Sequence, residues 1–290
     1  MVHEDLAELR TLGIRETGRN DEVLDFAREI HIDSLGYAYP GQKGNALHDI
    51  TITIPKNASI GFVGASGAGK TTIVDVLLGL LTPTEGRVLV DGKDIHEGIS
   101  AWQRKIGYIP QQIYLTDDTI RRNVAFGLPD EEIDDEAVWA ALEAAQLRDL
   151  VEALPERLDA EVGEHGSRLS GGQRQRIGIA RALYRRPEVL VMDEATSALD
   201  NQTERHFVEA LDRLQGEHTM IVIAHRLSTV RGCDTLYMLD DGRLVAQGTY
   251  EELMQSSEAF RRMAQSAHDA DRPAAPRAEG RPLSTHLLWR

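Results

Sequence analysis

Short apolar runs alternate with segments of helical periodicity along much of the chain between residues 59 and 250. The apolar runs are continuous, as in strands buried on both faces of a sheet, and the segments between them repeat apolar residues at helical spacing. This alternation predicts an α/β fold whose mainly parallel sheet is covered on both faces. The expected strands are residues 59–63, 189–192 and 220–224, and the expected helices are residues 72–81, 173–184 and 204–214.

A different pattern precedes this region. Residues 47–54 alternate apolar and polar positions, and residues 30–39 are strand-like up to the turn at Pro40-Gly41. Such alternation is typical of half-buried antiparallel strands, so we expect an N-terminal antiparallel β subdomain. Further strands are expected at residues 87–90 and 106–109, as a second small β layer, and in a hairpin at residues 235–239 and 244–247.

Between residues 118 and 154 the pattern changes to several short helices with acidic outer faces. We interpret this stretch as part of an α-helical subdomain, about residues 113–180, that is inserted into the α/β core. Its expected buried residues are Ile120, Val124, Val138, Leu142, Leu147, Leu150 and Val151.

The two ends of the chain lack the pattern of a packed core. Residues 1–29 carry two mildly amphipathic stretches, 4–12 and 21–30, which we interpret as a surface helix pair or as a connector toward a partner domain. Periodicity is lost from Ala267 onward, and we expect residues 263–290 to form a disordered tail. The domain between these ends spans residues 30–262.

Composition narrows the function classes. The 290 residues carry a net charge of −15, which argues against wide contact with nucleic acid because such contact needs a basic face. The single cysteine, Cys233, excludes a disulfide framework and is expected to be a small buried side chain. No segment approaches the roughly 18 consecutive apolar residues of a membrane span, and no signal peptide opens the chain. We therefore expect a cytosolic polypeptide that does not cross a bilayer by itself.

The stretch GASGAGKT, from Gly64 to Thr71, matches the phosphate-loop pattern G-x-x-x-x-G-K-[ST] and lies between an expected strand and an expected helix. Its glycines let the backbone direct N–H groups at phosphate oxygens, and the helix N-terminus adds partial positive charge. We expect Lys70 to reach the β- and γ-phosphates of a nucleotide, and the Thr71 hydroxyl to help hold Mg²⁺. The predicted nucleotide-binding residues here are Gly64, Ser66, Gly67, Ala68, Gly69, Lys70, Thr71 and Thr72.

The apolar run at residues 189–192 ends in two carboxylates, Asp193 and Glu194. A buried strand delivers such terminal acids to the edge of the sheet, where ligands of α/β proteins bind. In a chain with a phosphate loop, Asp193 is placed to hold Mg²⁺ through a water. Glu194 points elsewhere and would polarise an attacking water in line with the γ-phosphate.

A second anion site is predicted at the stretch LSGGQ, residues 169–173. Ser170 would cap the helix that follows, and Gly171 and Gly172 leave backbone N–H groups bare. One chain thus carries two helix starts that are suited to phosphate.

With these motifs in this order, residues 30–262 resemble the nucleotide-binding domain of an ABC transporter. The resemblance identifies residues 64–71 as the Walker A loop, residues 189–193 as the Walker B strand and Glu194 as the catalytic glutamate. It also implies that Ser170, Gly171, Gly172 and Gln173 form the signature motif, which completes the ATP site of the opposite subunit. Ser170 and Lys70 of one chain are therefore expected to lie apart.

The same resemblance implies roles for four more residues. Tyr39 falls where an aromatic ring stacks on adenine. Gln111 falls where the Q-loop glutamine reaches Mg²⁺ and the attacking water and senses the transmembrane partner. Asp200 belongs to a D-loop-like stretch, and His225 resembles the switch histidine that contacts the γ-phosphate.

Residues 161–166, EVGEHG, resemble the stretch with which ABC exporters contact their transmembrane domains. Ala160 and His165 depart from this pattern, which usually has Thr and Arg at these positions. Residues 111–120 are similar to cassettes of polysaccharide or lipid-linked-oligosaccharide flippases. Exporter cassettes are usually fused behind membrane helices, so the resemblance implies either an excised or split half, with residues 1–29 as the former connector, or a separate permease.

We therefore expect an ATPase that powers export at the cytoplasmic face of a membrane. ATP and Mg²⁺ are its expected ligands, and a second identical nucleotide-binding domain and the transmembrane domains of an exporter are its expected partners. An ABC ATPase that acts on nucleic acid or ribosomes is the alternative, disfavoured by the single cassette and the acidic balance. A regulator that binds nucleotide without hydrolysis conflicts with the set Gln111, Asp193, Glu194 and His225.

Overall fold

The computed structural model describes residues 24–41, 44–193, 213–224 and 227–270. The strands are β1 (Glu29–Tyr37), β2 (Leu47–Pro55), β3 (Ser59–Val63), β4 (Glu85–Val90), β5 (Lys93–Asp94), β6 (Ile106–Ile109), β7 (Val189–Asp193), β8 (Thr219–Ile223), β9 (Thr235–Asp240) and β10 (Arg243–Gly248). The helices are α2 (Lys70–Leu77), α3 (Ile99–Arg104), α4 (Ile120–Val124), α5 (Asp135–Ala144), α6 (Arg148–Glu152), α7 (Gly171–Leu183), α9 (Leu227–Val230), α10 (Tyr250–Ser256) and α11 (Glu258–Ala270). Four short 3-10 turns are η1 (Ile95–Glu97), η2 (Asp130–Glu132), η3 (Arg157–Asp159) and η4 (Glu164–Gly166).

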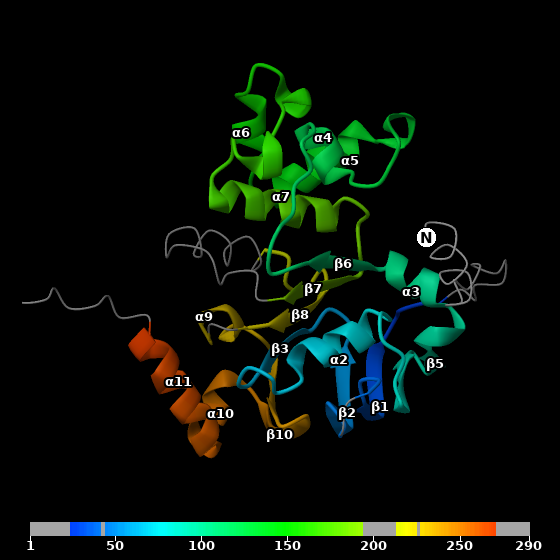
Figure 1. Ribbon diagram of the computed structural model, residues 1–290, viewed down its shortest axis with the longest axis vertical. Coiled ribbons are helices and arrows are strands. Elements are labelled where there is room, and N and C mark those ends of the chain that lie inside the picture. The colour runs from blue at the N-terminus through cyan, green and yellow to red at the C-terminus, as the bar shows by residue number, and fades with distance from the viewer. Residues whose placement is uncertain (1–23, 42–43, 194–212, 225–226, 271–290) are drawn as a thin grey trace, which may run out of the picture.

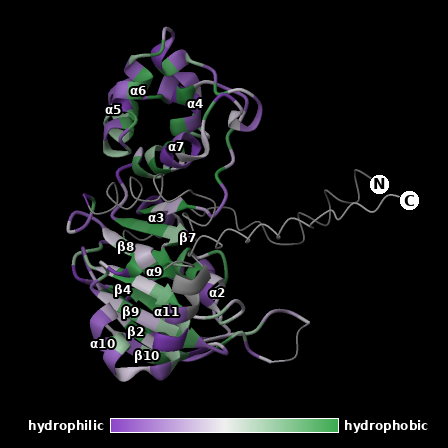
Figure 2. Cartoon of the chain, turned by 90° about the vertical axis from the view of Figure 1, so that its left-hand side faces the viewer, coloured by the Kyte–Doolittle hydropathy of each residue, from purple (hydrophilic) through white to green (hydrophobic). Residues whose placement is uncertain are grey.

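The central sheet has the strand order β10-β9-β3-β8-β7-β6, in which β10 is antiparallel to β9 and the other five strands run parallel. Both of its faces are buried. In β7, Val189 and Val191 belong to one hydrophobic cluster and Leu190 and Met192 to another, since successive side chains of a strand point to opposite faces. Hydrophobic residues accordingly concentrate in the strands of this body (Figure 2). The predicted α/β class and the covered parallel sheet are confirmed.

The second sheet has the order β2-β1-β4-β5 and is antiparallel, as expected for the N-terminal β subdomain. The expected second small β layer is wrong, however. Strand β4 pairs with β1 in this same sheet, and β6 is the edge strand of the parallel sheet, beside β7. Gly107 permits this placement, because a Cβ there would lie 2.6 Å from the carbonyl oxygen of Ala182 in α7.

Residues 24–28 contain no helix, so the helix expected over residues 21–30 is wrong for the described part. The carboxylate of Asp91 instead accepts hydrogen bonds from the backbone N–H groups of Ala27, Arg28 and Glu29, at 2.6, 2.9 and 2.9 Å. The Phe26 ring is buried edge-on against Trp102. The hydrogen bonds to Asp91 use backbone N–H groups that a helix would need. Together with the ring contact, they hold residues 24–28 against the rest of the fold.

Helices α4 to α7 form a lobe above the sheet, joined to it through the segments after β6 and before β7 (Figure 1). The prediction of an inserted subdomain made of helices is confirmed. Its expected apolar residues are buried in the hydrophobic cluster that contains Leu190 and Met192, except that Leu150 is only partly buried.

Other expectations at the ends of the chain have mixed outcomes. Helix α11 continues to Ala270, so the stretch that begins at Ala267 starts inside a helix rather than in a tail. The helix expected at residues 4–12, the rest of the tail, and the helix expected at residues 204–214, except for residues 213–214, which form a turn, lie outside the described residues. The hairpin β9–β10 and the burial of Cys233 are confirmed. Within the described ranges, none of the helices combines the length and the apolar character needed to cross a bilayer.

Candidate functional site

The phosphate loop connects β3 to α2, as predicted. Gly64, Gly67 and Gly69 adopt φ angles of 150°, 80° and 98°, a region that side-chain-bearing residues rarely enter. A Cβ on Gly64 would lie 2.2 Å from the Leu239 carbonyl oxygen. The glycines therefore allow both the tight turn and its close contact with β9.

Helix α2 starts without a side-chain cap. Its N-cap is Gly69, and the first intrahelical hydrogen bond runs from the Ile73 N–H to the Gly69 carbonyl at 3.0 Å. The N–H groups of the three residues before Ile73 have no partner within the helix, because the first turn of any helix lacks acceptors. Such a start, with the partial positive charge of the helix, suits a phosphate.

Lys70 brings a positive charge to the same place. Only 7% of the residue is exposed, and its Nζ donates to the carbonyl oxygens of Gly64 and Ala65, both at 2.9 Å. The ammonium therefore lies within the turn of the loop, where it adds to the field of the helix start.

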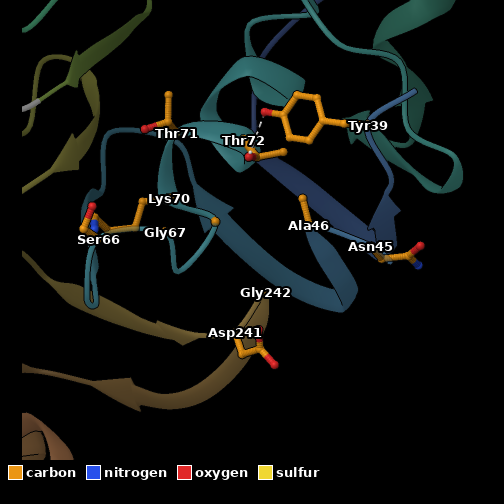
Figure 3. A pocket seen from close by; sticks show the side chains of 11 residues that line it. Tyr39, Asn45, Ala46, Ser66, Gly67, Lys70, Thr71, Thr72, Asp241 and Gly242 are labelled. Carbon is orange, nitrogen blue, oxygen red and sulfur yellow. Dashed lines mark hydrogen bonds between the residues drawn. The ribbon is translucent and has the colours of Figure 1, made fainter. Parts of the chain in front are cut away.

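A pocket of about 410 Å³ opens beside this loop (Figure 3). Tyr39 lines one side of the pocket. The other side includes Asp241 and Gly242, which the sequence analysis did not predict as site residues. Gly242 of the β9–β10 turn is tied to the loop, since its N–H donates to the Ala68 carbonyl at 3.2 Å. The residues around the pocket are Tyr39, Asn45, Ala46, Ser66, Gly67, Gly69, Lys70, Thr71, Thr72, Asp241 and Gly242.

The lining of the pocket suits a nucleoside triphosphate. The glycine turn, the uncapped helix start and the buried ammonium suit the phosphates. The Thr71 hydroxyl and the carboxylate of Asp193 are oxygen donors of the kind that Mg²⁺ prefers. The half-buried ring of Tyr39 offers an aromatic face for a base.

Asp193 ends strand β7 at the same edge of the sheet as the loop. Asp193 pairs with Ile223 of β8, and Ile223 also pairs with Phe62 of β3, so the ends of the two strands are level. The Tyr108 hydroxyl donates to Asp193 Oδ2 at 3.5 Å. Burial, the charges of Asp193 and Asp75 and this hydrogen bond raise the pKa of Tyr108 to about 12.

Gln111 follows β6, the neighbour of β7, and therefore lies at this edge as well. The strand register thus places the phosphate loop, Asp193 and Gln111 at one edge of the central sheet. Glu194, Asp200 and His225 lie outside the described residues.

The second predicted anion site is at the start of α7. The Ser170 hydroxyl accepts from the Gln173 N–H at 3.2 Å, and the Gln173 side chain accepts from the Ser170 N–H at 2.8 Å. This capping box uses the Gln173 side chain, which the sequence placed among the nucleotide contacts. Gly171 and Gly172 contribute the remaining N–H groups of the first turn. Ser170 and Gly171 are exposed.

The two anion sites of one chain are not brought together. Helix α7 belongs to the upper lobe and α2 to the body beneath it, and the lining of the nucleotide pocket contains no residue of α7 (Figure 1). The expected separation of Ser170 from Lys70 therefore agrees with the fold.

An exposed aromatic patch lies on the helical lobe, and it consists of Tyr114, Phe126, His165 and Arg181. Tyr114 is 60% exposed and Phe126 51%. The Arg181 guanidinium lies 4.7 Å from the centre of the Phe126 ring and donates to the Tyr114 carbonyl, and His165 meets the Tyr114 ring edge-on. Phe126 also borders a groove of about 330 Å³. Isolated aromatics in the sequence gave no sign that they share one surface.

The fold and the site together define a phosphate-loop NTPase with an antiparallel β layer and a helical insertion that carries the LSGGQ motif. Residues 47–197 match the family described as ABC transporter, and the chain belongs to that family. It is thus an ATP-binding, ATP-hydrolysing domain of the family.

Similar proteins agree with this assignment. An "ATP-dependent lipid A-core flippase" of Bordetella avium is 42% identical over 78% of this chain, which covers 38% of that protein. A "Mitochondrial potassium channel ATP-binding subunit" of Homo sapiens is 43% identical over 85% of this chain, which covers 34% of it. Among solved structures, "a bacterial Atm1-family ABC exporter with ATP bound" superposes with a TM-score of 0.81 and 34% identity, over 94% of this chain and 48% of that chain. The chain thus spans less than half the length of these relatives.

Proposed function

We propose that this chain is the ATP-hydrolysing part of an ABC exporter and powers translocation through ATP-driven dimerisation. The observation that carries the proposal is the separation of the two helix starts. The body has a pocket with a buried lysine, whereas the LSGGQ helix start is exposed in the other lobe. A second copy placed head to tail would supply what each pocket lacks, in a symmetric dimer.

Within each composite site, the residues of one chain bind and orient the nucleotide. Lys70 and the loop N–H groups hold the phosphates, Thr71 and Asp193 hold Mg²⁺, and Tyr39 stacks on the adenine. Mg²⁺ held by Thr71 and Asp193 would neutralise charge on the β- and γ-phosphate oxygens. The other chain adds Ser170, Gly171, Gly172 and Gln173, and Asp200 takes part in nucleotide binding.

Hydrolysis needs a positioned water. Glu194 polarises this water, Gln111 orients it, and His225 contacts the γ-phosphate. ATP thereby joins the two chains and its hydrolysis releases them, so that each cycle closes and opens the dimer.

The closing and opening of the dimer move the transmembrane domains to which it is attached. We assign the aromatic patch and its groove as the surface that receives a cytoplasmic segment of the transmembrane domains, at the cytoplasmic face of the membrane. Support comes from the patch itself, since exposed aromatic side chains beside an arginine are typical of interface centres. Support for export, and for a lipid or glycolipid substrate, comes from the flippase and exporter named among the similar proteins.

A complementation experiment tests the composite site. Lys70→Ala breaks the pocket and Ser170→Arg blocks the exposed helix start, so either variant alone should hydrolyse almost no ATP. In an equal mixture, half of the dimers carry one intact site made of two chains, and about a quarter of wild-type activity should return. A mixture as inactive as its components, or full activity of Ser170→Arg alone, would overturn the proposal.

A further inference from the structure

Two hydroxyl groups meet on the wall of the nucleotide pocket. The Tyr39 hydroxyl and the Thr72 Oγ1 lie 3.1 Å apart, within hydrogen-bond distance, although 33 residues separate them in the chain. Figure 3 shows the Tyr39 ring reaching over the start of α2 with its hydroxyl directed at Thr72. Thr72 is 7% exposed, so its hydroxyl has little access to water.

A second contact holds the same ring. Tyr37, at the end of β1, meets the Tyr39 ring edge-on, with centroids 5.0 Å apart and an interplanar angle of 90°. Tyr39 follows the strand rather than belonging to it, so the backbone ladder of β1 does not fix its side chain. The Tyr37 ring and the hydroxyl of Thr72 both restrain the Tyr39 ring.

A restrained ring is a better platform for a base than a freely rotating one. An aromatic side chain that must be ordered on binding loses rotamer freedom, and a ring already held in place avoids that loss. Thr72 also belongs to the first turn of α2, which presents its N–H groups to the phosphates. One residue thereby connects the base side of the pocket with its phosphate side.

We propose that Thr72 is a positioning residue for the nucleobase, because its hydroxyl holds the Tyr39 ring in the orientation that stacks on the base. This inference rests on the proposed role of Tyr39 as the base platform. It predicts that the effects of substituting Thr72 and Tyr39 on ligand affinity are coupled when the ligand carries a base, and are not coupled when the ligand has only phosphates.

The test compares ADP with pyrophosphate, which lacks the base, by calorimetry on the full chain. Tyr39→Phe and Thr72→Val each remove one hydroxyl and keep the shape of the side chain. We expect each to weaken ADP binding by about two- to tenfold, and the double variant to bind no more weakly than the weaker single variant. For pyrophosphate, Tyr39→Phe should have no effect, alone or combined with Thr72→Val. Thr72→Ser, which keeps the hydroxyl, should bind ADP like the wild type.

Other outcomes overturn the inference. Additive losses for ADP would mean that the two hydroxyls act separately, and equal coupling with pyrophosphate would mean that the base is not involved. Tyr39→Ala separates this failure from failure of the proposed function. If Tyr39→Ala binds ADP as the wild type does, the base platform itself is wrong. If it binds ADP weakly while the hydroxyls show no coupling, only the role of Thr72 fails. Unchanged pyrophosphate binding shows in each case that the variant is folded.

Discussion

The two helix starts that the sequence marks as phosphate sites differ in what completes them. Helix α2 begins after a left-handed glycine with no side-chain cap, and it opens into a pocket that also holds a buried lysine. Helix α7 begins with a capping box, and the hydroxyl of its exposed Ser170 already serves its own helix. The start of α2 is therefore part of a pocket that can bind a ligand. The start of α7 offers only the backbone N–H groups of its exposed first turn.

The difference extends to the nearest positive charges. Lys70 lies in the turn of the phosphate loop. In the first turn of α7, the Arg174 guanidinium donates to the carbonyl oxygens of Leu169 and Gly166, at 2.7 and 3.3 Å, and so stabilises the turn before the helix. Both cations thus donate to backbone carbonyls of the loop before their helix, but Lys70 also lines the nucleotide pocket, and Arg174 does not.

The largest expected effect comes from removing the cation of the first start. Lys70→Ala should weaken ATP binding by more than about 100-fold, because a charge-assisted contact with the phosphates is lost in a buried place. Calorimetry measures the affinity. Lys93→Ala, which removes the same charge from the exposed strand β5, is the matched control and should bind normally. Equal affinities of the two variants would remove the distinction between the helix starts.

A large effect on turnover without loss of binding is expected from Glu194→Gln. Loss of a general base slows hydrolysis by about 10²- to 10⁴-fold. The phosphate contacts of α2 and α7 are untouched, so ATP-dependent dimerisation should persist. Phosphate release and light scattering after gel filtration measure the two properties. Near-normal turnover would exclude Glu194 from this role.

Ser170→Ala separates the cap of α7 from its proposed contact with ATP. Loss of the cap should lower the free energy of unfolding by about 1 kcal/mol. The capping box of Thr249 and Glu252 at the start of α10 offers a matched control, since Thr249→Ala removes an equivalent hydroxyl far from the motifs. Only Ser170→Ala should also reduce hydrolysis, and neither variant should change the ATP affinity of the single chain. Denaturant unfolding and phosphate release compare the two, and equal hydrolysis would refute the contact.

The smallest expected effect is on the free energy of unfolding, and it comes from Asp91, which belongs to neither helix start. Burial alone would raise the pKa of Asp91, but hydrogen bonds from the backbone of Glu29, Ala27 and Arg28 and the charge of Arg28 outweigh it and hold the pKa below its ordinary value. Such a carboxylate stabilises the fold above its unfolded pKa, and this stability is lost as the pH falls through the folded pKa.

Asp91→Asn should therefore lower the free energy of unfolding by about 1 kcal/mol at neutral pH and by less in acid. Denaturant unfolding at several pH values measures the difference between the two proteins. A difference that does not shrink in acid would show that the charge of Asp91 is not what holds residues 24–28. Nucleotide affinity should be unchanged, because neither Asp91 nor residues 24–28 line the pocket.

Much of the fold and of the site could be predicted because the signals are local. The phosphate loop needs a lysine and glycines within a few residues, and the capping box at Ser170 needs a glutamine three residues on. Continuous apolar runs indicated the parallel strands for the same reason, since burial on both faces leaves its mark on every residue of the run.

Pairings between distant segments gave no such signal. The apolar run of β6 indicates a strand, but it does not indicate that β7 is the neighbouring strand. Residues 24–28 have a weak helical pattern, yet they are not helical, because their backbone N–H groups donate to the Asp91 carboxylate instead. Asp241 enters the nucleotide pocket, and Tyr114 meets Arg181, only because the chain brings them together.

The sequence by itself thus determined the chemistry of this protein: a phosphate loop, an acid at the end of a buried strand, and a capped helix start rich in glycine. Tertiary structure decided that one helix start lies in a pocket and the other on an exposed lobe. The physical reason is that hydrogen bonds within a turn depend on neighbouring residues, whereas burial and charge around a site depend on which distant segments pack against it.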